Sequence, residues 1–188
     1  MLLCHTEQMR TVVVCCLLCI LSLPARATVL IPADLGELSR DALAIARGRV
    51  MALDAQWTED HGSIETIVTL EVESYLKGAL GSTLRFRVPG GELGRFRSVV
   101  VGAPGFAVDE RVVVFLGARG PSVPHLLGMS QGVFRVARAA DNSGWLVTSP
   151  VLLPGTVTAR VVRGDPSRRA FALGDFEQTV RALAGAAK

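Results

Sequence analysis

The sequence predicts a mainly β protein: a closed or partly open β-barrel with a short helix before it and an amphipathic helix after it. Three observations favour this fold. The stretch 63–78 (SIETIVTLEVESYLKG) alternates apolar and polar residues, which is typical of a strand with one buried face. A strand of that length bends around the core of a small barrel more readily than it lies in an open sheet. Further strand patterns flank it, and helix patterns stand only near the two ends of the mature chain.

The first elements precede this long strand. A short helix is expected over 34–42, because Asp34 can cap it and Glu37 stands at the third position of a capping box. A strand follows over 43–53. Its apolar parity changes near Gly48, which predicts a β-bulge at a corner of the barrel. Residues 56–62 form the expected connecting turn.

The remaining strands are short. We expect them at 83–88, 95–101, 111–116, 132–137, 145–148 and, as a further edge strand, 156–162. Residues 89–94 predict a bulged turn, and 111–116, apolar at both parities, predicts a central strand with both faces covered. An exposed basic loop over 164–169 and a helix capped by Asp175 complete the expected domain.

Residues 1–27 carry the pattern of a secretory signal peptide that is removed. Arg10 precedes an apolar run over 12–23, and the segment ends in Ala25-Arg26-Ala27. The run is shorter than the about 20 residues that span a bilayer. The mature chain, 28–188, is therefore predicted to be one exported domain, periplasmic or extracellular, without a transmembrane anchor. Met9 as the true start and lipidation at Cys19 are alternatives.

The positions of the cysteines and the net charge exclude several classes of function. All cysteines lie in the segment to be removed (Cys4, Cys15, Cys16 and Cys19), so the mature domain lacks disulfides and thiol chemistry. The net charge of +3 is too mild to demand a nucleic-acid or anionic-membrane partner. Aromatic residues make up 5% of the chain, few for stacking on single-stranded bases. No nucleic acid is expected.

The order of elements resembles a known group of secreted domains. Gly48-Arg49-Val50 ends a first strand, the long strand runs into Lys77-Gly78, and 109–116 gives a strand of the "G-E-x-V-V-V-F" type. This outline is similar to netrin-like modules and tissue inhibitors of metalloproteinases, and to uncharacterised secreted bacterial proteins marked by "P-G-G-E…G" (89–94) and "G-x-P-x-F" (102–106). The resemblance implies an OB-like barrel. The inhibitors bind the protease zinc through an amino-terminal cysteine, whereas the mature chain begins with Thr28, so no functional residue is carried over.

The candidate binding residues form a basic face. They alternate on two strands that neighbour each other in the expected barrel: Arg85, Arg87, Arg95 and Arg97. Such a face fits an acidic envelope polymer or a partner protein. The alternative is a solvated face in which Glu71 and Glu73 pair with these arginines. The apolar loop 99–106 is a second candidate docking segment.

Two further patterns suggest hydrolysis. Gly128-Met129-Ser130-Gln131-Gly132 matches a nucleophile elbow, but a strand is expected after it where the elbow needs a helix. Glu59, Asp60 and His61 form a polar turn that carries metal-ligand types, with His125 as the other mature histidine. The sequence therefore favours a secreted non-enzymatic binding module, an inhibitor or accessory of an envelope or extracellular protein, with no cofactor. A serine or metal-dependent hydrolase is the alternative.

Overall fold

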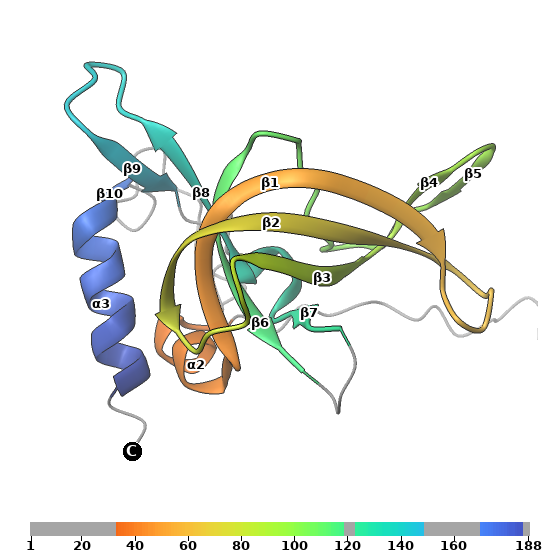
Figure 1. Cartoon of the computed structure of the whole chain (residues 1–188), viewed down its shortest axis with the longest axis horizontal. Coiled ribbons are helices and arrows are strands. Elements are labelled where there is room, and N and C mark those ends of the chain that lie inside the picture. The colour runs from red at the N-terminus through yellow and green to blue at the C-terminus, as the bar shows by residue number, and fades with distance from the viewer. Residues whose placement is uncertain (1–32, 119–122, 149–169, 186–188) are drawn as a thin grey trace, which may run out of the picture.

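The computed structural model describes residues 33–118, 123–148 and 170–185, and it confirms a mainly β molecule with two α-helices among them (Figure 1). The helices are α2 (Leu35–Asp41) and α3 (Leu173–Gly185), and a 3₁₀ turn, η1, spans Met129–Gly132. The strands are β1 (Ala44–Trp57), β2 (Ile64–Lys77), β3 (Thr83–Pro89), β4 (Gly91–Leu93), β5 (Phe96–Ser98), β6 (Arg111–Gly117), β7 (His125–Leu126), β8 (Val133–Arg138), β9 (Trp145–Thr148) and β10 (Phe171–Ala172).

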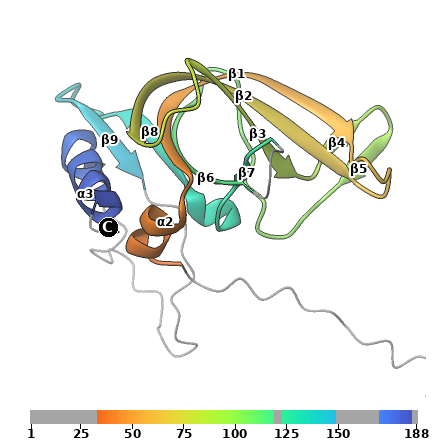
Figure 2. The same cartoon turned by 60° about the horizontal axis from the view of Figure 1, so that its bottom comes forward.

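The described strands form a partly closed ring with an extension. The larger sheet has the order β1-β2-β3-β7-β6-β8-β9-β10, and β1 also pairs with β6, which closes five strands into the ring. Between β3 and β6 the closure depends on the two-residue strand β7, which pairs with β3 at a single position. Figure 2 shows these strands arranged as a ring, and a hydrophobic core fills the interior of the ring. β4 and β5 form a separate two-stranded sheet.

The long strand β2 and the bulge in β1 are confirmed. β1 and β2 pair from Ile45↔Lys77 to Trp57↔Ile64, and one of the register shifts lies between Arg47 and Gly48. At this bulge a Cβ on Gly48 would lie 2.2 Å from the backbone oxygen of Glu71, so only glycine lets the two strands approach so closely. The bend carries β1 from one side of the ring, where it pairs with β6, to the other.

The strand β6 separates two hydrophobic cores. Its even residues, among them Val112 and Val114, face the ring interior, where they meet residues such as Leu70 and Phe86. Its odd residues, such as Phe115, face a second core that α2, α3 and β8 cover. Because both faces are buried, the run 111–116 is apolar throughout, as the sequence predicts for a central strand.

The helices complete the second core. Asp34 caps α2, its side chain accepts a hydrogen bond from the Glu37 amide, and the reciprocal bond completes the predicted capping box. Phe176 and Val180 of α3 are buried against the sheet. The Phe134 ring packs against the Phe176 ring in a tilted arrangement, with centroids 4.8 Å apart.

Several predicted boundaries are wrong. The strand expected at 43–53 continues to Trp57, because pairing with β2 persists while Asp54 and Gln56 point outward. The strand expected at 95–101 is only β5, since its partner β4 lies inside the expected turn 89–94 and ends at Leu93. α3 begins at Leu173, so Asp175 lies in its first turn. The strands β7 and β10 were not predicted.

Some predictions fall outside the described residues. The signal peptide (1–27), the edge strand at 156–162 and the basic loop at 164–169 lie there. Within the described part of the chain, no helix has the length and apolar character needed to cross a bilayer.

Candidate functional site

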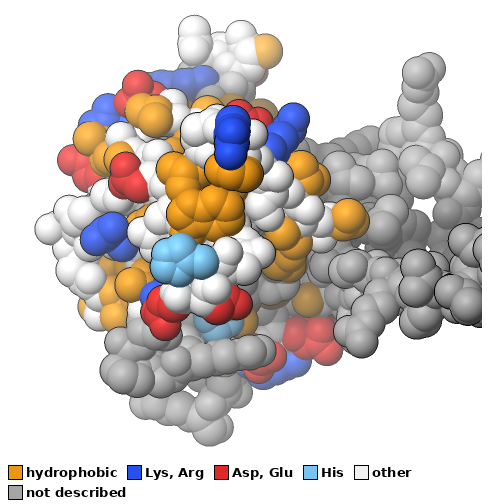
Figure 3. Space-filling view, turned by 90° about the vertical axis from the view of Figure 1, so that its right-hand side faces the viewer, with side chains coloured by type: hydrophobic (Ala, Val, Ile, Leu, Met, Phe, Trp, Pro, Cys, Tyr) orange, Lys and Arg blue, Asp and Glu red, His pale blue; other side chains and the backbone are white. Residues whose placement is uncertain are grey.

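A cleft of about 570 Å³ lies at the end of the ring where β4 and β5 stand. Its residues come from β1, β2 and β3 (Leu53, Ala55, Thr66, Val88), from the β4–β5 hairpin, and from the loop after β5 that ends at Phe106. The size is that of a pocket for a small ligand or for a few side chains of a partner. Figure 3 views the molecule from this end.

Apolar side chains stand exposed around this end of the ring. Val99 and Val101 are 74% and 71% exposed, and Phe96 is 47% exposed. Figure 3 shows hydrophobic side chains gathered in the centre of this face with charged side chains around them. Exposed apolar groups that are contiguous with a cleft mark interaction surfaces more often than scattered ones do.

Aromatic contacts hold the hairpin and the loop that contribute residues to the cleft. The Trp57 ring at the end of β1 contacts the Phe96 ring of β5 edge-on, with centroids 5.4 Å apart. The Phe106 ring at the end of the loop contacts Phe86 of the ring interior, with centroids 5.6 Å apart. The hairpin and the loop are therefore each anchored to the ring by one aromatic pair.

Glycines shape the cleft walls. A Cβ on Gly91 would lie 2.6 Å from the Thr66 hydroxyl, so the missing side chain lets β4 lie directly on β2. Gly90 and Gly91 both have positive φ, and Gly94 (φ 60°) supplies the first residue of the two-residue turn between β4 and β5. Gly105 differs, because a Cβ there meets no atom within 4 Å. A side chain at 105 would occupy open space at the cleft without straining the backbone.

The predicted basic face is divided between two places. Arg85 and Arg87 lie on β3, whereas Arg95 and Arg97 belong to the β4–β5 hairpin, and β5 pairs with β4 instead of β3. Arg87 Nη2 lies 3.6 Å from Glu59 Oε1 and Arg87 Nη1 lies 3.9 Å from Glu65 Oε2. Arg97 lines the cleft.

The two arginines of the hairpin have different neighbours. The Arg97 Nε lies 3.2 Å from Glu92 Oε1, and both side chains are largely exposed. The Arg95 guanidinium lies over the Phe96 ring, 5.1 Å from its centroid. These two cations therefore stand beside the exposed apolar residues of the cleft.

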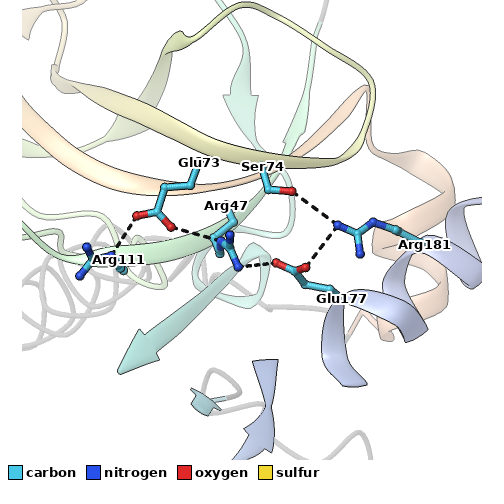
Figure 4. Close-up of polar contacts among 6 residues, drawn as sticks. All are labelled: Arg47, Glu73, Ser74, Arg111, Glu177 and Arg181. Carbon is cyan, nitrogen blue, oxygen red and sulfur yellow. Dashed lines mark hydrogen bonds and ion pairs between the residues drawn. The ribbon is translucent and has the colours of Figure 1, made fainter. Parts of the chain in front are cut away.

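Glu71 and Glu73 of β2 pair with other arginines than those expected. Arg49 Nη2 lies 2.9 Å from Glu71 Oε2, and Glu73 binds Arg47 and Arg111. Figure 4 shows that this network continues to α3: Arg47 Nη1 lies 2.7 Å from Glu177 Oε1, and Arg181 Nη2 lies 3.2 Å from Glu177 Oε2. Arg47 Nε lies 3.2 Å from Glu73 as an ion pair without aligned hydrogen-bond geometry. The cluster joins α3 to the sheet.

The residues considered for hydrolysis lie in a 3₁₀ turn and in the turn between β1 and β2. Ser130 lies in η1, and β8 follows it where a nucleophile elbow has a helix. The Asp60 carboxylate accepts hydrogen bonds from the Thr58 hydroxyl and the Gly62 amide, which lowers its pKa below the usual value. No group of three or more His, Cys, Asp or Glu side chains in the described ranges could hold a metal ion.

Comparison of the chain with protein-family models, with curated proteins and with solved structures finds no match. The cleft itself was not predicted as one site. The sequence predicts a turn at 89–94 and a docking segment at 99–106, and residues of both line the same cleft. Both segments contain glycine and proline, which is the sequence feature that they share. Their spacing along the chain does not show that they face each other in the fold.

Proposed function

We propose that this protein is an exported, non-enzymatic binding module that holds a partner protein in the cleft at the open end of its ring. Its role is then that of an inhibitor or accessory of an envelope or extracellular protein. The observation that carries this proposal is the cleft and its margin of exposed apolar residues, which are Val99 in the lining and Phe96 and Val101 next to lining residues along the chain.

The energetics support a binding role for this margin. Each exposed valine or phenylalanine leaves apolar area in water that burial against a partner would remove, at about 25 cal/mol per Å². The neighbouring walls are already held by the Trp57–Phe96 and Phe86–Phe106 contacts. A partner therefore meets a surface that needs little ordering on binding, which favours affinity.

We further infer that the ring is an OB-like, partly open barrel. The support is the five-strand closure, the bulged β1, the long bent β2 and the short β7 that leaves one side weakly closed. In such barrels ligands bind at a sheet face or between loops, while the barrel positions them.

Site-specific photo-crosslinking in the producing cell tests the proposal. A photoreactive side chain placed at Val99 is expected to capture one defined partner, whereas the same group at Leu43, an exposed apolar position on the approach to β1, is expected to capture none. Gly105→Trp should abolish the crosslink from position 99 because it fills space at the cleft. Gly144→Trp is the matched control, since a Cβ there also meets no atom within 4 Å.

Two outcomes would contradict the proposal. One is a crosslink of equal yield from positions 99 and 43. The other is a crosslink from position 99 that survives Gly105→Trp in a correctly folded protein. Far-ultraviolet circular dichroism of both glycine variants checks that the fold is retained.

A further inference from the structure

We infer that Arg135 and Glu110 are positioning residues for the cleft. Neither side chain belongs to the cleft lining, yet together they hold the loop 99–107, whose residues form one wall of the cleft. This inference rests on the proposed function, because it states what keeps the proposed binding surface in shape. The support comes from the composition of the loop and from the contacts on either side of Phe106.

The loop contains few groups that could fix its shape from within. Residues 98–108 include no charged side chain, and Val99 and Val101 stand largely in solvent. One backbone hydrogen bond inside this stretch joins the Ala103 amide to the Val100 carbonyl. Ordering a loop costs conformational entropy for every residue that is fixed. Contacts from outside the loop are therefore needed to hold the wall.

The Arg135 guanidinium reaches this loop from β8. Its Nη2 donates a hydrogen bond of 2.9 Å to the Gly105 carbonyl oxygen, and its Nη1 forms an ion pair with Glu110 Oε1. Gly105 lines the cleft, whereas β8 is held between β6 and β9. A guanidinium presents its donors in a fixed planar fork, so one group can orient a carbonyl and a carboxylate together. A single side chain therefore joins the cleft wall to the sheet.

Glu110 holds the loop on the other side of Phe106. Its Oε2 accepts a hydrogen bond from the Ala107 amide at 3.2 Å, and its side chain is only 18% exposed. The Glu110 backbone is fixed as well, because its carbonyl accepts a hydrogen bond of 2.9 Å from the Val50 amide of β1. The Arg135–Glu110 pair therefore holds the backbone both before and after Phe106.

The position of Phe106 depends on this pair. The Phe106 ring lines the cleft and contacts the Phe86 ring of the core, with centroids 5.6 Å apart. If the peptide units on its two sides could turn freely, the ring would leave this contact and the wall would change shape. A wall that is ordered beforehand favours binding, because less entropy is lost when the partner arrives. Arg135 and Glu110 thus act on binding from outside the cleft.

The η1 turn holds the loop at a separate point. The Ser130 amide donates a hydrogen bond of 2.9 Å to the Gly102 carbonyl oxygen. This contact does not involve Arg135 or Glu110. Its protection from hydrogen exchange therefore serves as an internal reference for a local change at 105–107.

Amide hydrogen exchange of the purified mature protein tests whether the pair orders the loop. In Arg135→Met we expect the Ala107 amide to exchange about tenfold faster, since the acceptor of its hydrogen bond loses the ion pair that orients it. The Ser130 amide and the amides of β2 should keep the wild-type rate. Arg138→Met is the matched control, because it removes a guanidinium from the same strand that contacts Trp145 instead of the loop.

Two further variants test the chemistry of the pair. Arg135→Lys keeps the positive charge but lacks the planar fork, so the Ala107 exchange rate is expected to lie between those of the wild type and Arg135→Met. Glu110→Gln retains an oxygen that can accept from the Ala107 amide but loses the ion pair, so it should accelerate exchange in the same direction. Far-ultraviolet circular dichroism checks that each variant is folded.

The crosslinked partner tests whether the ordered loop matters for binding. Its dissociation constant should rise about fivefold for Arg135→Met, because the wall must then be ordered during binding. The melting temperature and the exchange of β2 should remain those of the wild type. A merely structural role would instead lower the melting temperature and accelerate the loop and β2 together.

Three outcomes would overturn the inference. The first is unchanged exchange of Ala107 in Arg135→Met, and the second is equal acceleration in the loop and in β2. The third is faster exchange of Ala107 with unchanged affinity for a partner that Gly105→Trp excludes, and in that case the proposed function stands. If the partner is indifferent to both substitutions, the inference and the proposed function are both wrong.

Discussion

Single residues decide how closely the backbone segments of this protein approach each other. Gly48 lies at the bulge where β1 pairs with β2, and a Cβ at this position would collide with the Glu71 carbonyl oxygen and the Leu70 side chain. Gly91 lets β4 lie on Thr66 in the same way. Gly105 and Gly144, in contrast, have open space around them. Glycine is therefore required at the first two positions by contact and only tolerated at the last two.

Gly48→Ala is expected to lower the free energy of unfolding by about 1–3 kcal/mol, the usual cost of forcing an extra carbon into a packed site. The physical reason is the 2.2 Å approach of the new Cβ to the Glu71 oxygen, which β1 and β2 must separate to relieve. Urea denaturation measures the loss. Gly144→Ala should change the free energy by less than about 0.5 kcal/mol. Equal effects of the two substitutions would show that the close approach at the bulge is not required.

At the scale of elements, sequence periodicity predicts the helices and strands that local residue patterns determine. It does not predict the short strands that form only when distant strands come together. The capping box of α2, the amphipathic β2 and the doubly buried β6 each depend on residues close in sequence, and all were predicted. The two-residue strands β7 and β10 exist only because β3, β6 and β9 lie beside them. No pattern of two residues carries that information.

The helix α3 is held on the sheet by apolar packing and by one partly buried carboxylate. The Glu177 side chain is 13% exposed and contacts both Arg47 of β1 and Arg181 of its own helix (Figure 4). A helix joined mainly through one face and one ion-pair cluster is a separable unit of the fold.

Glu177→Gln is expected to lower the free energy of unfolding by about 1–3 kcal/mol, because it leaves the Arg47 guanidinium partly buried with a weakened partner. Hydrogen exchange of the α3 amides should accelerate more than that of β2. Glu71→Gln is the matched control, since it also removes a carboxylate from an arginine of β1 but at an exposed pair, where solvent screens the interaction and little change in stability is expected. Unchanged α3 exchange in Glu177→Gln would show that packing alone holds the helix.

At the scale of the whole molecule, the ring places two loops of unrelated pattern at the same end. The segments 89–92 and 103–106 are separated along the chain by β5 and yet line one cleft, because β3 ends at Pro89 and Phe106 returns to contact Phe86. The sequence predicts that both segments are loops. It does not predict the site, because their meeting depends on how the five strands close.

The candidate arginines also show that the sequence predicts which side chains are exposed but does not predict which strands are neighbours. Alternation along 83–88 and 95–101 predicts outward side chains, and Arg85 and Arg97 are indeed exposed. Their assignment to one face requires β3 and β5 to be neighbours, and the intervening hairpin turn instead pairs β5 with β4. Arg95 and Arg97 of the predicted face therefore lie in the β4–β5 hairpin, whereas Arg85 and Arg87 lie on β3.

The dissociation constant between the purified mature protein and its crosslinked partner tests most directly whether the cleft is the binding site. Calorimetry on the wild type, Gly105→Trp and Gly144→Trp gives the three values under one set of conditions. We predict that Gly105→Trp binds at least about tenfold more weakly, a loss of about 1.4 kcal/mol, while Gly144→Trp binds as the wild type does. Equal affinity of Gly105→Trp and the wild type would contradict the assignment of function to this cleft.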